Sequence, residues 1–128
     1  MEKSILIIED NKYKMSHIKD ALFEKHNDIN LIVCSSRNEA MRIIMNNRDI
    51  ELIILDWNFP AYADDYPVKG MGKYILNMLS VLGIATKVII CSSENISIEH
   101  SNVIGQILYN PNTILSFEEF DELITKSR

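Results

Sequence analysis

The sequence predicts an α/β domain in which a parallel sheet lies between helices on both of its faces. The first observation is an apolar run at residues 52–55, which lacks the polar alternation of a half-exposed strand and ends at Asp56. Such a run is typical of a strand covered on both faces. The second is a similar run at residues 4–8, which leads directly into Glu9 and Asp10. Third, segments with helical periodicity alternate with these runs, as they do when right-handed crossovers join parallel strands.

The first half of the chain predicts two strand and helix pairs before the central strand. After the first strand, apolar residues recur at three- and four-residue steps over residues 11–25, which indicates a helix with one buried stripe. The stripe consists of Met15, Ile18, Ala21 and Leu22. Residues 30–34 read as the second strand. Ser36 and Glu39 have the spacing of a capping box, so we expect a second helix to begin there and to extend to about residue 47.

The second half continues the alternation after a long interruption. Residues 57–67 contain two prolines and no single period, so they predict a loop. A helix is expected at residues 70–82, with Gly83 placed to end it, followed by a strand at 86–91. Residues 95–102 leave room for a short helix at most. The last strand is expected at 106–109, and the final helix follows a second capping box, Ser116 and Glu119.

Length and composition favour a single domain spanning residues 1–128, because 128 residues suffice for one core and not for two ordinary domains. A formal charge of −5 without a basic stretch argues against nucleic-acid binding. Cys34 and Cys91 follow apolar strand-like residues, which indicates buried reduced thiols rather than a disulfide framework. With no signal-peptide pattern and no apolar span, we expect a cytoplasmic protein that does not enter a membrane.

Three carboxylates are predicted to meet at one edge of the sheet. Asp56 follows the central strand and the pair Glu9 and Asp10 follows the first, and the carboxyl ends of parallel strands share an edge where ligands gather. A few carboxylates with room for water suit Mg²⁺. A carboxylate can also attack a phosphoryl group while a divalent cation offsets the charge. The alternative interpretation is that polar residues simply occur where buried strands end.

The chain resembles the receiver domains of bacterial two-component response regulators, of the chemotaxis-regulator type, over nearly its whole length. The acidic pair after the first strand matches, and so does the segment 56–60, which has Asp, two residues, an apolar residue and Pro. The hydroxyl residue after the fourth strand is Ser92. The resemblance implies a flavodoxin-like fold with a five-stranded sheet in the order 2-1-3-4-5, here with a shortened fourth helix.

The resemblance also implies roles for individual residues. Asp56 would accept the phosphoryl group, Glu9 and Asp10 would hold Mg²⁺ together with it, and Asn58 would offer its backbone carbonyl to the metal. Ser92 would hydrogen-bond a phosphoryl oxygen as the switch. The implied protein is a stand-alone receiver that takes a phosphoryl group from a histidine kinase or phosphotransfer protein. It would signal through contact with a downstream protein, and would not be an enzyme.

The sequence departs from the family at the end of the fifth strand. Asn110 occupies the place of the family's lysine, and a neutral amide cannot supply the positive charge that pairs with the phosphoryl group or its acceptor. Lys12 and Lys69 are the nearby lysines considered as substitutes. The family's switch aromatic falls at Ile107, with Tyr109 two residues further on along the same strand face.

The connections differ from the family as well. The loop after Asp56 is longer, and the stretch from Ser92 to Asn110 is shorter, so the partner surface is expected to be rebuilt. Two further functions therefore stay open. One is a pseudo-receiver that binds partners without phosphorylation control. The other is a small phosphotransferase or phosphatase, which is disfavoured because no second acid or base is placed beside Asp56.

Overall fold

The computed structural model describes residues 3–23, 29–47 and 49–126, and it contains a five-stranded, all-parallel sheet in the order β2-β1-β3-β4-β5. The strands are β1 (Lys3–Ile8), β2 (Ile29–Cys34), β3 (Ile50–Leu55), β4 (Lys87–Ser92) and β5 (Val103–Leu108). The helices in the described residues are α1 (Lys12–Phe23), α2 (Arg37–Asn46), α3 (Gly72–Val81) and α4 (Phe117–Lys126). The predicted doubly wound, flavodoxin-like topology is therefore confirmed.

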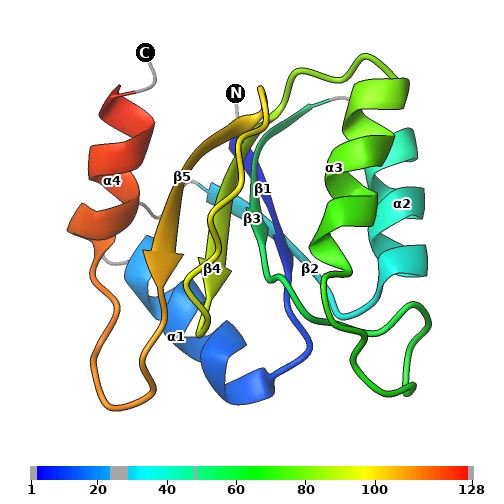
Figure 1. Cartoon of the computed structure of the whole chain (residues 1–128). Helices are drawn as coiled ribbons and strands as arrows, with labels where there is room; N and C mark the ends of the chain where they lie inside the picture. Colours follow the sequence, from blue (N-terminus) through cyan, green and yellow to red (C-terminus); the bar gives the residue numbers. More distant parts are fainter. Residues whose placement is uncertain (1–2, 24–28, 48, 127–128) are drawn as a thin grey trace.

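The sheet lies between two layers of helices, with α1 and α4 on one face and α2 and α3 on the other (Figure 1). Side chains of β1 alternate between these layers. Ile5 and Ile7 pack with Ile18 of α1, whereas Leu6 and Ile8 belong to the core on the α2 and α3 side. Both faces of the sheet are thus buried, which explains why the strands read as continuous apolar runs.

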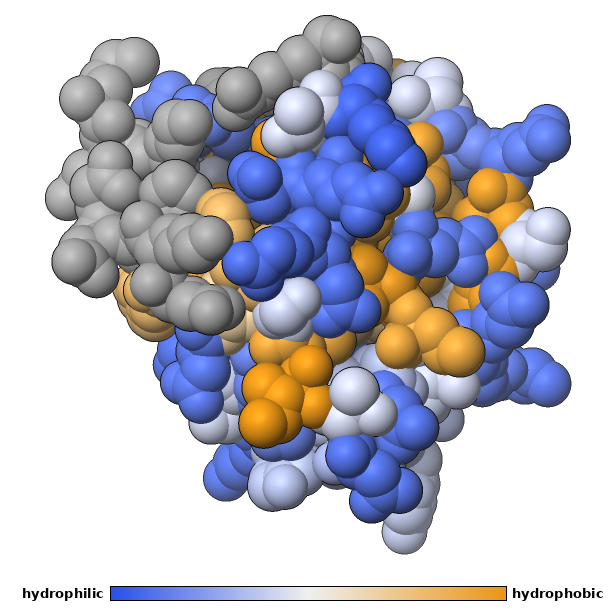
Figure 2. Space-filling model, turned by 90° about the vertical axis from the view of Figure 1, so that its left-hand side faces the viewer, coloured by the Kyte–Doolittle hydropathy of each residue, from blue (hydrophilic) through white to orange (hydrophobic). Residues whose placement is uncertain are grey.

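The surface on the α4 side of the molecule carries many polar side chains. On the side of the molecule that carries α4, Figure 2 shows hydrophilic side chains interrupting the apolar ones across the visible surface. In α4, Phe117 and Phe120 are buried, while Glu118, Glu119 and Asp121 are exposed. One stripe of α4 therefore packs on the sheet and the opposite side faces solvent.

The strand register brings the ends of β1 and β3 to the same level. Ile8 pairs with Leu55, and the ladder continues one residue further because the Asp56 N–H donates to the Ile8 carbonyl at 3.0 Å. On the other side of β1, the Glu9 N–H donates to the Cys34 carbonyl at 3.0 Å. These bonds fix the backbone of both acidic segments at the carboxyl edge of the sheet.

The long loop after β3 is tied down at several points. Phe59 and Val68 form an antiparallel bridge, and the Val68 N–H donates to the Phe59 carbonyl at 3.1 Å. The Pro60 and Ala61 carbonyls accept hydrogen bonds of 2.9 Å from the first two N–H groups of α2. Those N–H groups have no partner within their own helix. The loop therefore completes the N-terminus of α2, which is also capped by the Ser36 hydroxyl. This hydroxyl accepts from the Glu39 N–H at 3.3 Å and donates to Glu39 Oε1 at 2.8 Å.

The shortened fourth helix is absent from the described structure. Between β4 and β5, residues 95–100 have no regular secondary structure, and Ile96 and Ile98 are partly buried against the core on the α2 and α3 side. The geometry explains the difference. The connection must return along a six-residue strand, roughly 20 Å at the rise of a strand. Ten residues in a helix would reach only about 15 Å, so this stretch spans the distance in a more extended form.

Element boundaries shift by a few residues elsewhere. β5 begins at Val103 rather than at residue 106, and α3 begins at Gly72 and ends at Val81, where Gly83 follows with a φ of 66°. The expected end of the first helix, at residue 25, lies outside the described residues. Within the described part of the chain, the helices are too short or too polar to cross a membrane.

Candidate functional site

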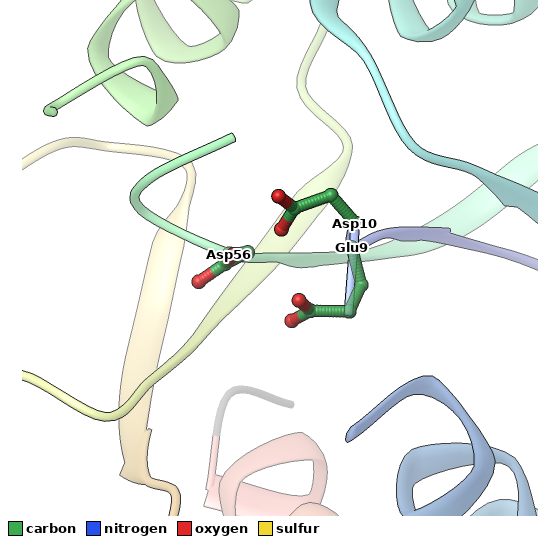
Figure 3. Close-up of side chains that lie close together, drawn as sticks. All are labelled: Glu9, Asp10 and Asp56. Carbon is green, nitrogen blue, oxygen red and sulfur yellow. The ribbon is translucent and has the colours of Figure 1, made fainter. Parts of the chain in front are cut away.

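Three carboxylates converge at the carboxyl edge of the sheet, as the sequence predicted. Glu9 and Asp10 follow β1 and Asp56 follows β3, and each offers an oxygen within 4.8 Å of the others (Figure 3). Glu9 is 3% exposed and Asp56 is 8% exposed, while Asp10 is half-buried. The cluster is therefore largely shielded from water, which strengthens its electrostatic interactions.

Short local hydrogen bonds connect the acidic pair to the start of α1. The Asn11 N–H donates to Glu9 Oε2 at 3.1 Å, and Asn11 Oδ1 accepts from the Lys14 N–H at 3.0 Å. Asn11 thus acts as the N-cap of α1. On β3, Asp56 Oδ1 accepts a hydrogen bond of 2.8 Å from the Trp57 N–H. The cap places the first turn of α1 directly beside the carboxylates.

Lys14 supplies a cation to this cluster. Its Nζ lies 2.7 Å from Glu9 Oε1 and 3.0 Å from Asp56 Oδ1, and it donates to the Cys91 carbonyl at 2.6 Å. Sequence reasoning missed this residue and considered Lys12 and Lys69, which are both exposed. The available signal was its spacing, because Lys14 lies four residues before Ile18 and therefore on the buried stripe of α1.

Asn110 does not take the place of a site cation. It is exposed, two residues beyond β5, and its Oδ1 accepts a hydrogen bond of 2.9 Å from the Asn112 N–H. Asn110 is therefore a turn residue. Tyr109 is buried instead, with its ring centroid 5.5 Å from the Lys14 ammonium and its hydroxyl 3.0 Å from His17 Nδ1.

Ser92 and Asn58 lie at the same edge of the sheet but have other hydrogen-bond partners. The Ser92 hydroxyl accepts from the Glu94 N–H at 3.1 Å. Asn58 Oδ1 accepts from the Gly70 N–H at 2.8 Å, and its amide donates to Glu94. The contact of Ser92 with a phosphoryl oxygen and that of the Asn58 carbonyl with a metal stay predictions.

The electrostatics of the cluster follow from burial and from the crowding of like charges. Burial raises the pKa of Glu9 above its ordinary value, Asp56 adds to that effect, and Lys14 opposes it. Burial and Asp56 likewise raise the pKa of Asp10. Burial alone would lower the pKa of Lys14, but Glu9 and Asp56 raise it above its ordinary value, so this amine is held as an ammonium.

The residues present fit a divalent cation. Glu9 Oε1 is fully buried and, among the described residues, receives no hydrogen bond, since Lys14 approaches it as an ion pair without hydrogen-bond direction. With all groups ionised, three carboxylates and one ammonium leave a formal charge of −2. Hard oxygen ligands with a net negative charge are what Mg²⁺ requires. A bound cation would also relieve the repulsion that raises the carboxyl pKa values.

A groove of about 760 Å³ leads from this cluster along α1 toward the long loop. It is lined by Glu9 and Asp10, by residues of α1 including Lys19, and by Asp64 and Asp65 of the loop. The long loop therefore brings Asp64 and Asp65 to the same groove as Glu9 and Asp10.

Comparison with known proteins identifies the fold. No protein-family model and no curated protein matches the chain. Solved structures do match, among them a two-component response regulator from Legionella pneumophila, at 18% identity and a TM-score of 0.70 over 98% of this chain and 99% of that one. The phosphorylated cyanobacterial phytochrome response regulator RcpA matches at 22% identity and a TM-score of 0.63, covering 99% and 91%.

A third match is the Mn²⁺-bound form of response regulator Rcp1, at 20% identity and a TM-score of 0.57 over 73% of this chain and 67% of that one. The chain therefore has the fold of CheY-like receiver domains, in agreement with the resemblance noted in its sequence.

Proposed function

We propose that this protein is a response regulator receiver domain in two-component signalling, and that it accepts a phosphoryl group on Asp56 in the presence of Mg²⁺. The observation that carries the proposal is the buried cluster in which Glu9, Asp10 and Asp56 lie within 4.8 Å of one another beside an ammonium group. The similarity to a phosphorylated and to a Mn²⁺-bound response regulator supports it.

In the proposed reaction, an oxygen of Asp56 attacks the phosphorus atom of a phosphohistidine as the phosphorus–nitrogen bond breaks. The bonding pair of electrons leaves with the imidazole, which takes a proton, and an acyl phosphate remains on Asp56. The Trp57 N–H, 2.8 Å from Asp56 Oδ1, orients the carboxylate. Glu9 and Asp10 would hold Mg²⁺ together with Asp56 and the Asn58 carbonyl, and the cation would offset charge on the transferring group.

The proposal assigns a histidine kinase or phosphotransfer protein as donor and a downstream protein as the recipient of the signal. It places the protein in the cytoplasm, where such donors act, and treats it as a phosphoacceptor rather than an enzyme with turnover. Ser92 would hydrogen-bond the phosphoryl group after exchanging its present bond with the Glu94 N–H.

The test is incubation with Mg²⁺ and either acetyl phosphate or beryllofluoride, followed by intact mass and by Trp57 fluorescence. Trp57 is 6% exposed and adjoins the acceptor, so its emission should report the adduct. Asp56→Asn is the matched control and should give neither signal. A wild-type protein that stays unmodified, under conditions that modify an ordinary receiver, would refute the proposal.

The second candidate function is a pseudo-receiver that binds its partner without phosphorylation. It is favoured by the exposed position of Asn110 and by the missing helix between β4 and β5 in the described structure. This function predicts that partner binding survives Asp56→Asn. A large loss of affinity in that variant, together with adduct formation by the wild type, would decide for the signalling receiver.

A further inference from the structure

Lys14 is the one buried lysine among the side chains that the structure describes, and the burial is nearly complete, with 7% of its side chain exposed. Removing an ammonium group from water is costly unless paired groups compensate for the loss of hydration. Other lysines of α1, such as Lys12, remain accessible to solvent. The position of Lys14 therefore needs a specific set of partners.

Those partners come from three neighbouring strands. The ammonium contacts Glu9 after β1, Asp56 after β3 and the Cys91 carbonyl of β4, at 2.7, 3.0 and 2.6 Å. The ammonium thus donates hydrogen bonds to Asp56 Oδ1 and the Cys91 carbonyl and forms an ion pair with Glu9 at the carboxyl edge of the sheet. The ring of Tyr109, the residue after β5, lies 5.5 Å from the same nitrogen, so the end of β5 also borders it. Lys14 is held at the acceptor carboxylate itself, not in the surrounding groove.

We propose that Lys14, reaching inward from α1, is the group that compensates the negative charge of a phosphoryl group on Asp56. This inference rests on the proposed function and adds to it the residue that performs a task Asn110 cannot perform. The acceptor needs a cation because an acyl phosphate adds negative charge beside the buried Glu9 and half-buried Asp10 carboxylates. Lys14 already contacts the Asp56 carboxylate, to which the phosphoryl group would be attached.

The position of Lys14 should favour phosphoryl transfer but oppose the binding of Mg²⁺. Because Lys14 lies within 3.0 Å of two of the three carboxylates, its positive charge opposes the binding of a divalent cation there. Lys14→Gln should therefore bind Mg²⁺ more tightly while reacting more slowly with a phosphoryl donor. A variant that is merely less well folded would lose both properties together.

The experiment measures Mg²⁺ affinity by Trp57 fluorescence and the rate of acetyl phosphate adduct formation at saturating Mg²⁺. For Lys14→Gln we expect at least about a tenfold gain in Mg²⁺ affinity and at least about a tenfold loss in rate, the size of effect that one nearby charge produces. Lys14→Arg keeps the charge and should stay closer to wild type in both measurements. Lys12→Gln, on the exposed side of the same helix, should match wild type.

Three outcomes would overturn the proposal. The first is an adduct rate in Lys14→Gln that equals that of the wild type. The second is a Mg²⁺ affinity that is the same in Lys14→Gln and wild type, which includes the case in which neither protein binds Mg²⁺. The third is a Lys14→Arg variant that behaves like Lys14→Gln. If wild type forms no adduct but Lys14→Gln still gains Mg²⁺ affinity, the proposed function fails while the placement of the charge stands.

The wild-type protein offers a measurement that does not depend on the folding of a variant. The ¹⁵N resonance of the Lys14 ammonium should be protected from exchange by burial, and beryllofluoride should shift it as the group contacts the adduct. A resonance that stays unchanged while Trp57 reports adduct formation would also overturn the proposal.

Discussion

Replacing Gly72 by alanine should disturb the acceptor from the side of α3. A Cβ atom at this position would lie 2.5 Å from Trp57 Cε3, 2.9 Å from Trp57 Cζ3 and 3.1 Å from the Asp56 carbonyl oxygen. Trp57 is 6% exposed, so its ring has little space into which it can move. Overpacking of this kind costs about 1–3 kcal/mol, and Gly72 is the first residue of α3, where the helix preference of alanine for interior positions gives little compensation.

The net expectation for Gly72→Ala is a loss of about 1–3 kcal/mol in the free energy of unfolding, or roughly 4–11 °C in Tm for a domain of this size. Denaturant unfolding gives the free energy, and near-ultraviolet circular dichroism should show a reoriented Trp57. Mg²⁺ affinity should fall as well, because the Asp56 backbone is displaced. The intact hydrogen bond from the Gly72 N–H to the Trp57 carbonyl, 3.0 Å in the wild type, should lengthen.

Gly83→Ala is the matched control for this prediction. Gly83 has a φ of 66° and no atom within 4 Å of its hypothetical Cβ, so its cost is backbone strain of about 1–2 kcal/mol without steric contact. It should destabilise the fold while leaving Trp57 dichroism and Mg²⁺ affinity unchanged. A Gly72→Ala protein with wild-type stability and an unaltered Trp57 spectrum would contradict the steric argument.

Three further predictions concern the scaffold. Asn102→Ala should cost about 2 kcal/mol by denaturant unfolding, because the Asn102 amide donates two bonds of 2.8 Å to backbone carbonyls, and an unchanged midpoint would contradict this. Ser36→Ala should cost about 1 kcal/mol through loss of the cap shared with Glu39, seen as a lower Tm. Burial raises the pKa of Cys34 and Cys91 to about 12, so both stay protonated at pH 8, and native protein should react with iodoacetamide far more slowly than unfolded protein.

The sequence was sufficient to predict the sheet and the acidic cluster. Both depend on local patterns that the tertiary structure reinforces. The apolar run before Asp56 is buried on both faces, and the parallel order of β1 and β3 then requires their following carboxylates to share an edge. The helix start predicted at Ser36 is another local pattern that the structure confirms, because the Ser36 hydroxyl caps α2.

Lys14 was missed because a lysine is expected to face solvent, even where its spacing places it on the buried stripe of a helix. Its burial depends on the distance from α1 to three strand ends, which only the assembled sheet defines. The connection between β4 and β5 was also mispredicted in part. The local sequence there is compatible with a short helix. A helix formed by these residues would, however, be shorter than the return path over the sheet.

The contact between the long loop and α2 has a mechanical consequence for the acceptor. Two N–H groups at the start of α2 are bonded to carbonyls of the loop that follows Asp56. If the loop moved away, both N–H groups would have to hydrogen-bond water instead of the loop carbonyls. The loss of each such hydrogen bond costs about 0.5–1.5 kcal/mol. These two hydrogen bonds therefore tie the loop that follows Asp56, which also lines the groove, to the N-terminus of α2. Any ligand that repositions Asp56 and its following loop must also break the contacts of that loop with the N-terminus of α2.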